Sequence, residues 1–185
     1  MRLVAAVRAY VAHDDPATAA ANFVALVVGW NGPFYPLFVV ALVDRGVIAL
    51  SLLTMVATPF FLAIPWLSRL SSTGARAALP VVGTLHTLWC TKLLGPGTAV
   101  GLFLFPCIAL AGLLARREER RLLLVVAGFP LVATLLPDRA FGPPLMPLTA
   151  AQTAHLAGLN IGSVATLTFL LSLLFADLLR RGAAN

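Results

Sequence analysis

The sequence predicts an all-α integral membrane protein: a bundle of six transmembrane helices with both termini in the cytoplasm. Of its 185 residues, 60% are hydrophobic and 11% are charged, against about 45–50% and roughly 25% in soluble domains. Mean hydropathy is +0.95. Six spans of ~20 residues would occupy about 120 residues. Because little chain remains for a separately folded catalytic domain, we expect no enzymatic activity in the chain itself.

Three regions are expected along the chain. Residues 1–21 form an amphipathic cytoplasmic lead-in, residues 22–181 form the six-helix membrane domain, and residues 182–185 form a tail. The expected spans are 22–43, 47–67, 76–94, 98–115, 122–136 and 150–179.

Turn-forming residues separate these spans. The first two are divided by a short charged turn, Asp44-Arg45-Gly46, and the third and fourth by Gly95-Pro96-Gly97, because glycine and proline are the strongest local breaks. The fifth segment, 122–136, is short for a full crossing. A proline-rich loop, 137–147, precedes the sixth span.

The distribution of basic residues predicts the orientation. Ten fall on the N-terminal side of the predicted spans: Arg2, Arg8, Arg69, Arg76, Arg116, Arg117, Arg120, Arg121, Arg180 and Arg181. Arg45, Lys92 and Arg139 fall on the other. Since basic residues concentrate on the cytoplasmic side, both ends are expected inside a bacterial-type inner membrane. The basic residues lie at span ends rather than in one patch, so the lipid bilayer, and not nucleic acid, is the expected partner.

His86 is the one titratable group expected near the bilayer centre. It lies ten residues from both Arg76 and Pro96, hence ~15 Å from each end of its span. Cys90 shares its helix face, and Cys107 is expected at a similar depth on the next helix. These three residues could begin a metal site, but a packing or hydrogen-bonded role is favoured, because further ligands are missing and free cysteine is commonly a small buried hydrophobe.

A haem b held by two histidines would need His86 and His155. His155 is twenty-five residues before Arg180, about 37 Å along a helix, which places it at the outer interface. The two imidazoles are therefore expected at different depths, so a shared haem does not suit this arrangement. A haem with a single histidine ligand stays open.

Proline residues in the spans predict an inner cavity. Pro33 and Pro36 interrupt the first span beside Asn31 and Tyr35, and proline kinks a helix and frees a backbone carbonyl. Further prolines occur in later spans: Pro59, Pro65, Pro80, Pro106 and Pro130. The residues expected to contact a ligand are Asn31, Tyr35, His86, Trp89, His155 and Asn160.

The last span carries residues typical of close helix packing. Gly158 and Gly162 form a small-xxx-small pair, and Ser163 lies beside them. Such residues let helices approach and bond to one another. Packing inside the bundle is favoured over a homodimer interface, which stays open.

Several of these motifs together resemble the membrane anchors of bacterial adenylate cyclases and related sensor proteins. The resemblance covers about residues 22–181. It rests on an Arg-rich inner loop and on four stretches: His86-Thr-Leu-Trp89, Gly95-Pro96-Gly97, Gly101 to Cys107, and His155 to Asn160. It implies a sensory input whose sixth helix continues into a cytoplasmic signalling module. Some relatives carry haem b on several membrane histidines, for which this chain has too few. No cyclase follows Arg181, so cyclase activity is not expected here.

The leading hypothesis is a sensor or receptor anchor, alone or cut from a longer protein. A ligand or redox signal would bias the last helix and hence a cytoplasmic signalling module or partner. A small transporter or channel is the first alternative, although no mid-span carboxylate supports coupled transport. A membrane electron-transfer subunit with haem or a metal is the second.

Overall fold

The computed structural model describes residues 2–114 and 116–183, and these contain helices and no strand. The α-helices are α1 (Arg2–Val11), α2 (Pro16–Asn31), α3 (Tyr35–Leu42), α4 (Ile48–Ser51), α5 (Thr58–Ser68), α6 (Ser72–Leu94), α7 (Leu104–Leu114), α8 (Arg120–Thr134) and α9 (Ala150–Ala183). The short 3-10 helices are η1 (Gly32–Phe34), η2 (Arg45–Val47), η3 (Leu52–Met55), η4 (Pro96–Thr98), η5 (Val100–Phe103), η6 (Arg117–Glu119) and η7 (Asp138–Phe141).

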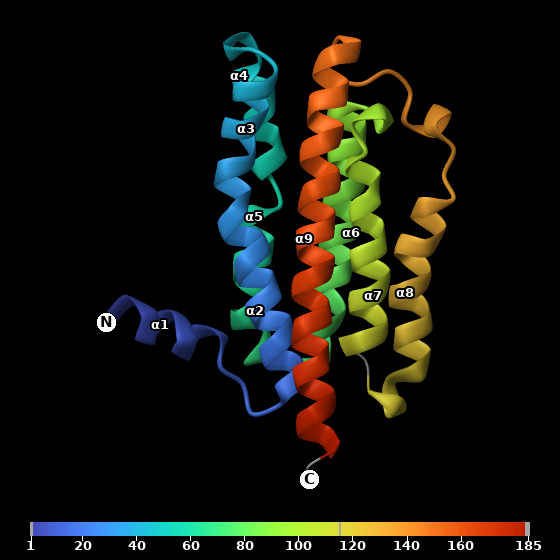
Figure 1. The fold of residues 1–185 in the computed structure, drawn as a ribbon. Helices are drawn as coiled ribbons and strands as arrows, with labels where there is room; N and C mark the ends of the chain where they lie inside the picture. Colours follow the sequence, from blue (N-terminus) through green and yellow to red (C-terminus); the bar gives the residue numbers. More distant parts are fainter. Residues whose placement is uncertain (1, 115, 184–185) are drawn as a thin grey trace.

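The helices stand side by side as long columns (Figure 1). One column is α2 continued by α3, a second is α4 continued by α5, and α6, α7, α8 and α9 stand beside them. A helix therefore occupies each of the six expected segments. Both termini lie at the same end of the bundle, where α1 points away from the columns (Figure 1).

The structure supports a helical membrane protein. Within the described residues, three stretches are long and apolar enough to cross a membrane: Pro16–Leu42, Arg45–Ser68 and Ala150–Leu178. The apolar helices Val100–Leu114 and Leu124–Thr134 are shorter. The count of long apolar helices is thus lower than the six spans expected from the sequence.

The outer surface of the columns is apolar. Large hydrophobic side chains are exposed on α3, α5, α7 and α9, among them Phe38, Phe60, Trp66, Phe105 and Phe169. A soluble monomer rarely exposes so much contiguous apolar surface. These side chains are suited to contact lipid.

Proline breaks the first column where the sequence predicts it. The 3-10 helix η1 contains Pro33 and separates α2 from α3, because proline supplies no backbone N–H for the helical ladder. The second column is also interrupted, at η3, between α4 and α5. These breaks lie within the two stretches that are long and apolar enough to span a membrane.

Two apolar clusters hold the columns together. The lower cluster includes Val24, Phe61, Leu79, Leu110, Leu171 and Phe175. The upper cluster consists of Val39, Leu93, Leu94, Met146 and Leu156. Helix α9 contributes to both clusters, so it packs against the bundle near each of its ends.

The upper end is closed by the loop between α8 and α9. Lys92 Nζ, near the end of α6, donates to the carbonyls of Phe141 at 2.9 Å and Pro143 at 2.8 Å. The backbone N–H of Met146 donates to Leu93 O at 2.9 Å, and its side chain is fully buried. Gly95 has a φ of +90°, a conformation in which glycine is favoured, so the expected turn follows α6 directly.

A charged network organises the lower end. Arg76, near the start of α6, is 4% exposed and forms ion pairs with Asp15 and Glu119. Arg116 forms a further pair with Asp15 at 2.9 Å. Asp15 is also the N-cap of α2 and accepts from the Thr18 N–H at 3.2 Å. One guanidinium thus joins α2, α6 and the connection between α7 and α8.

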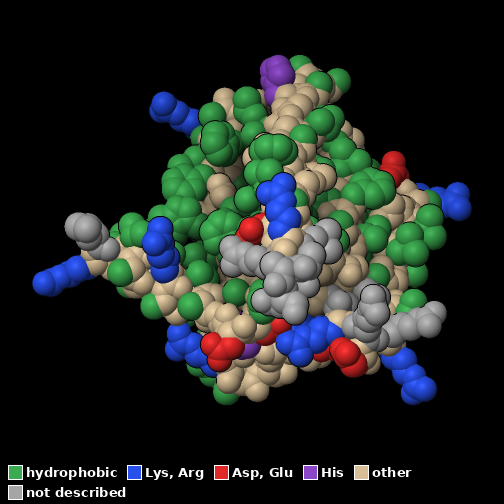
Figure 2. Space-filling view, turned by 60° about the horizontal axis from the view of Figure 1, so that its bottom comes forward, with side chains coloured by type: hydrophobic (Ala, Val, Ile, Leu, Met, Phe, Trp, Pro, Cys, Tyr) green, Lys and Arg blue, Asp and Glu red, His purple; other side chains and the backbone are tan. Residues whose placement is uncertain are grey.

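Figure 2 brings this end forward and shows Lys, Arg, Asp and Glu side chains gathered on it. The adjoining lead-in is attached by further hydrogen bonds. Asn22 Nδ2 donates to Ser68 Oγ at 2.9 Å and to Val11 O at 3.2 Å. Tyr10 donates to Leu62 O at 2.8 Å. The end of α1 is therefore held against α2 and α5.

Loss of the Arg76 guanidinium should destabilise the bundle more than loss of any exposed arginine. We expect Arg76→Gln to cost about 2–4 kcal/mol, because it leaves two partly buried carboxylates without their main partner. The control is Arg45→Gln at the exposed opposite end, with an expected cost within about 0.5 kcal/mol. Thermal unfolding in detergent measures both. Equal stability of the two variants would contradict a central role for Arg76.

Stability should fall in acid because of Asp15. Burial opposes its charged form, but hydrogen bonds from Thr18 and Arg116 and the charges of Arg116 and Arg76 lower its pKa from 3.8 to about 2. The ionised form therefore stabilises the fold above about pH 4, and this contribution disappears as pH falls through about 2.

Unfolding temperatures measured from pH 5 to pH 2 test this expectation. The wild type should lose more stability over this range than Asp15→Asn, which has no carboxyl to protonate. Asp138→Asn, in the loop at the opposite end, should behave as the wild type does. An unchanged acid sensitivity in Asp15→Asn would show that another group is responsible.

Candidate binding cavity

A cavity of about 590 Å³ lies between the columns. Its walls come from α2, η1, α3, η3, α5, α6, η5, α7 and α9, whereas no residue of α8 lines it among those described. Small-molecule sites commonly enclose ≈ 300–1,000 Å³ and are mostly apolar. The cavity has the size of such a site.

Irregular backbone forms part of the cavity wall. Gly32 of η1, Thr54 of η3 and Phe103 of η5 all line it. Non-helical backbone at membrane depth is tolerated where it is buried in protein or lines a cavity. The breaks in the first two columns therefore lie where the bundle can accommodate them.

Three serine and threonine hydroxyls in the wall donate to backbone carbonyls of their own helices. Thr87 donates to Gly83 O at 2.8 Å, Ser163 to Leu159 O at 2.9 Å, and Thr166 to Gly162 O at 2.9 Å. None of these donors needs a ligand. The wall thus presents mainly carbon atoms to an occupant.

His86 is a polar ring in the wall, and apolar groups surround it. Its ring packs edge-on against Phe61, with centroids 6.0 Å apart and planes at 84°. Cys90 Sγ lies 3.8 Å from Nδ1 and 3.7 Å from Nε2. The nearly equal distances place the sulfur off the lone-pair axis of either nitrogen, so this is a packing contact.

The structure places three of the six expected ligand residues in the cavity wall: Asn31, Tyr35 and His86. Asn160 is fully buried beside it, where Oδ1 accepts from the Tyr35 hydroxyl at 2.9 Å and Nδ2 donates to Thr98 O at 2.8 Å. Asn160 therefore ties α9 to α3 and η4. Its hydrogen bonds are used within the protein.

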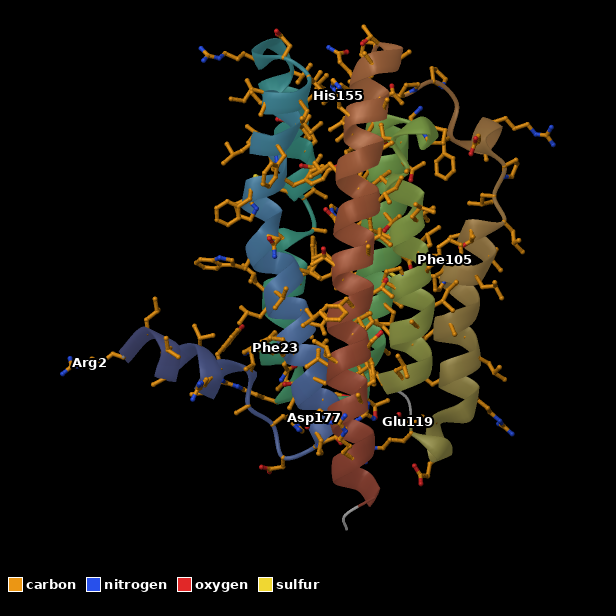
Figure 3. All side chains as sticks on the ribbon, viewed as in Figure 1. Arg2, Phe23, Phe105, Glu119, His155 and Asp177 are labelled. Atoms are coloured by element: carbon orange, nitrogen blue, oxygen red, sulfur yellow. The ribbon has the colours of Figure 1, made fainter. Side chains whose placement is uncertain are left out.

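The other two expected ligand residues lie elsewhere. Trp89 Nε1 donates to Leu53 O at 2.9 Å and so ties α6 to η3. His155 is exposed at the upper end of α9, far from Glu119 at the lower end (Figure 3). Neither residue lines the cavity. Because His86 is the one histidine among the lining residues, this arrangement does not offer a shared haem between His86 and His155.

The three residues considered for a metal site do not form one. Cys90 contacts His86, and Cys107 also lines the cavity and is buried. Across the described ranges, however, no three His, Cys, Asp or Glu side chains are placed to hold a metal ion. The packing role weighed for these cysteines suits their burial.

Gly158, Gly162 and Ser163 are the residues for which the sequence favours packing inside the bundle, and the structure places open space beside the two glycines. A Cβ built on Gly158 or Gly162 would meet no atom within 4 Å, and all three residues line the cavity. Closer approaches occur at Gly32, where a Cβ would overlap Thr58 Oγ1, at Gly29, where it would lie 2.9 Å from Leu62, and at Gly83, 2.8 Å from Cys107 Sγ. The small-xxx-small spacing does not reveal which helix faces touch.

Comparisons of the chain with known protein families, with curated proteins and with solved structures give no match. The described residues form an all-helical bundle that has three helices long and apolar enough to cross a membrane and an apolar cavity between its helices.

Alanine substitutions should separate packed glycines from glycines that face the cavity. Gly29→Ala should cost about 1–3 kcal/mol because the new methyl group overlaps Leu62 and Phe61. Gly162→Ala should be neutral or stabilising by up to about 1 kcal/mol, because alanine favours a helix and meets open space. Thermal unfolding measures both changes. A large loss in Gly162→Ala would mean that α9 packs more tightly there.

Proposed function

We propose that the chain is a six-span sensor anchor in a bacterial-type inner membrane, with its termini in the cytoplasm. A ligand in the cavity biases α9, and α9 passes the change to a cytoplasmic signalling module or partner. The observation that carries this proposal is the position of α9. It forms one cavity wall between two packed ends.

The geometry of α9 supports such a role. The helix has 34 residues, ~51 Å at 1.5 Å per residue, which exceeds the ≈ 30 Å bilayer core. Its lower end extends beyond the neighbouring columns, at the same end as the N-terminus (Figure 1). A change in the tilt of α9 would therefore be carried out of the membrane.

The orientation is supported by charge. The end of α5, the start of α6, the connection between α7 and α8, and the end of α9 lie at the lower end of the bundle. These segments hold most of the basic residues counted on the cytoplasmic side. The positive-inside rule then orients this end toward the cytoplasm.

The proposal requires that occupancy of the cavity changes α9. Gly162→Phe places a ring in the cavity without a Cβ clash and so imitates a bound ligand. Gly112→Phe is the matched control, because Gly112 on α7 is equally open but does not line the cavity. Hydrogen exchange measured by mass spectrometry in nanodiscs reports the effect.

We expect Gly162→Phe to change the exchange rates of residues 171–178 by at least threefold, whereas Gly112→Phe leaves them as in the wild type. Exchange in α8 serves as an internal reference. Identical exchange rates of residues 171–178 in both variants would contradict the proposal that α9 transmits the signal. Solute flux through liposomes containing the protein would instead support the transporter or channel.

A further inference from the structure

We infer that the cavity binds an uncharged, mainly hydrocarbon molecule dissolved in the bilayer. This inference rests on the proposed function, because it names the class of ligand that the sensor would detect. Three observations support it: the charge of the cavity wall, the hydrogen bonds of the lining residues, and the helices on which the exposed lining residues lie.

The wall offers no partner for a charged ligand. The described residues that line the cavity include no Asp, Glu, Lys or Arg. The nearest ends of α6 carry Arg76 and Lys92, but both side chains are engaged, by carboxylates and by loop carbonyls respectively. Burying an ion without a counter-charge is strongly unfavourable. The free-energy cost of burying an unpaired charge, and not the size of the cavity, therefore excludes an anionic or cationic head group.

The wall also has few hydrogen-bonding groups free to bind a polar ligand. The hydroxyls of Thr87, Ser163 and Thr166 donate to carbonyls of their own helices. The Tyr35 hydroxyl is bound to Asn160, and Asn31 Nδ2 donates to Val27 O at 2.8 Å. A sugar or a peptide would have to lose its hydration and would find few groups in return beyond the ring nitrogens of His86.

The exposed lining residues indicate where the ligand comes from. They lie on the α2–α3 column, at Asn31 and Phe38, and on α9, at Gly158, Gly162 and Thr166. These positions lie within two helical stretches that are long and apolar enough to span a membrane. An opening between these helices faces hydrocarbon and not water. The occupant is thus drawn from molecules that dissolve in the bilayer.

Three probes of equal chain length test the inference: tritiated 1-tetradecanol, which is neutral, and unlabelled tetradecanoate and tetradecylammonium as charged competitors. The protein is embedded in nanodiscs, and empty nanodiscs give the partition background. We expect one saturable tetradecanol site per chain. Each charged competitor should displace tetradecanol at least tenfold less effectively than unlabelled tetradecanol does.

Two variants locate the site. Gly162→Phe, which fills the cavity, should weaken tetradecanol binding at least tenfold, and Gly112→Phe should leave it unchanged. Unfolding curves recorded beforehand confirm that both variants are folded. Absence of a saturable site, undiminished binding to Gly162→Phe, or equally effective charged competitors would each overturn the inference.

The outcomes also separate this inference from the proposed function. If tetradecanol binds in the cavity but exchange in residues 171–178 does not respond, the ligand class stands and the signalling role fails. If a charged probe binds and alters that exchange, the signalling role stands and the ligand class fails.

Discussion

The ion-pair network of Arg76 is the interaction on which the arrangement of the lower end depends. A guanidinium that is 4% exposed is tolerated because Asp15 and Glu119 supply charge and hydrogen bonds. Asp15 at the same time caps α2, and Glu119 belongs to the connection between α7 and α8. The network thereby fixes three separate segments relative to one another. Since a buried arginine without partners would be costly, the helices can assemble in few other ways at this end.

The helix bundle is packed at both ends and contains a cavity between them. The upper end is held by Lys92, the buried Met146 and the contacts of Asn160 with Tyr35 and Thr98. Between the two ends, α9 faces a cavity instead of a packed neighbour. A helix fastened at both ends and free between them can respond to an occupant of the cavity. The packed contacts and the cavity thus lie at different levels of the same bundle.

The sequence alone located much of the fold. Hydrophobic runs and the Asp44-Arg45-Gly46 and Gly95-Pro96-Gly97 turns predicted where the helices lie, because these signals are local. Proline content also predicted the interruption near Asn31. Three stretches of the described residues, not six, are long and apolar enough to span a membrane, because α7 and α8 are short and α6 contains Arg76 and Lys92. Such helices are buried by neighbouring helices. The composition of a single helix does not show which neighbours it has.

What the sequence by itself determined is the class of protein, the helical segments and the residue types at membrane depth. Only the tertiary structure decided which faces meet. It brought Tyr35 to Asn160 across 125 positions of sequence, kept Trp89 and His155 out of the cavity wall, and turned Gly158 and Gly162 toward open space. Spacing along a helix fixes which residues share a face. The direction of that face depends on how every other helix packs, and this information is not local.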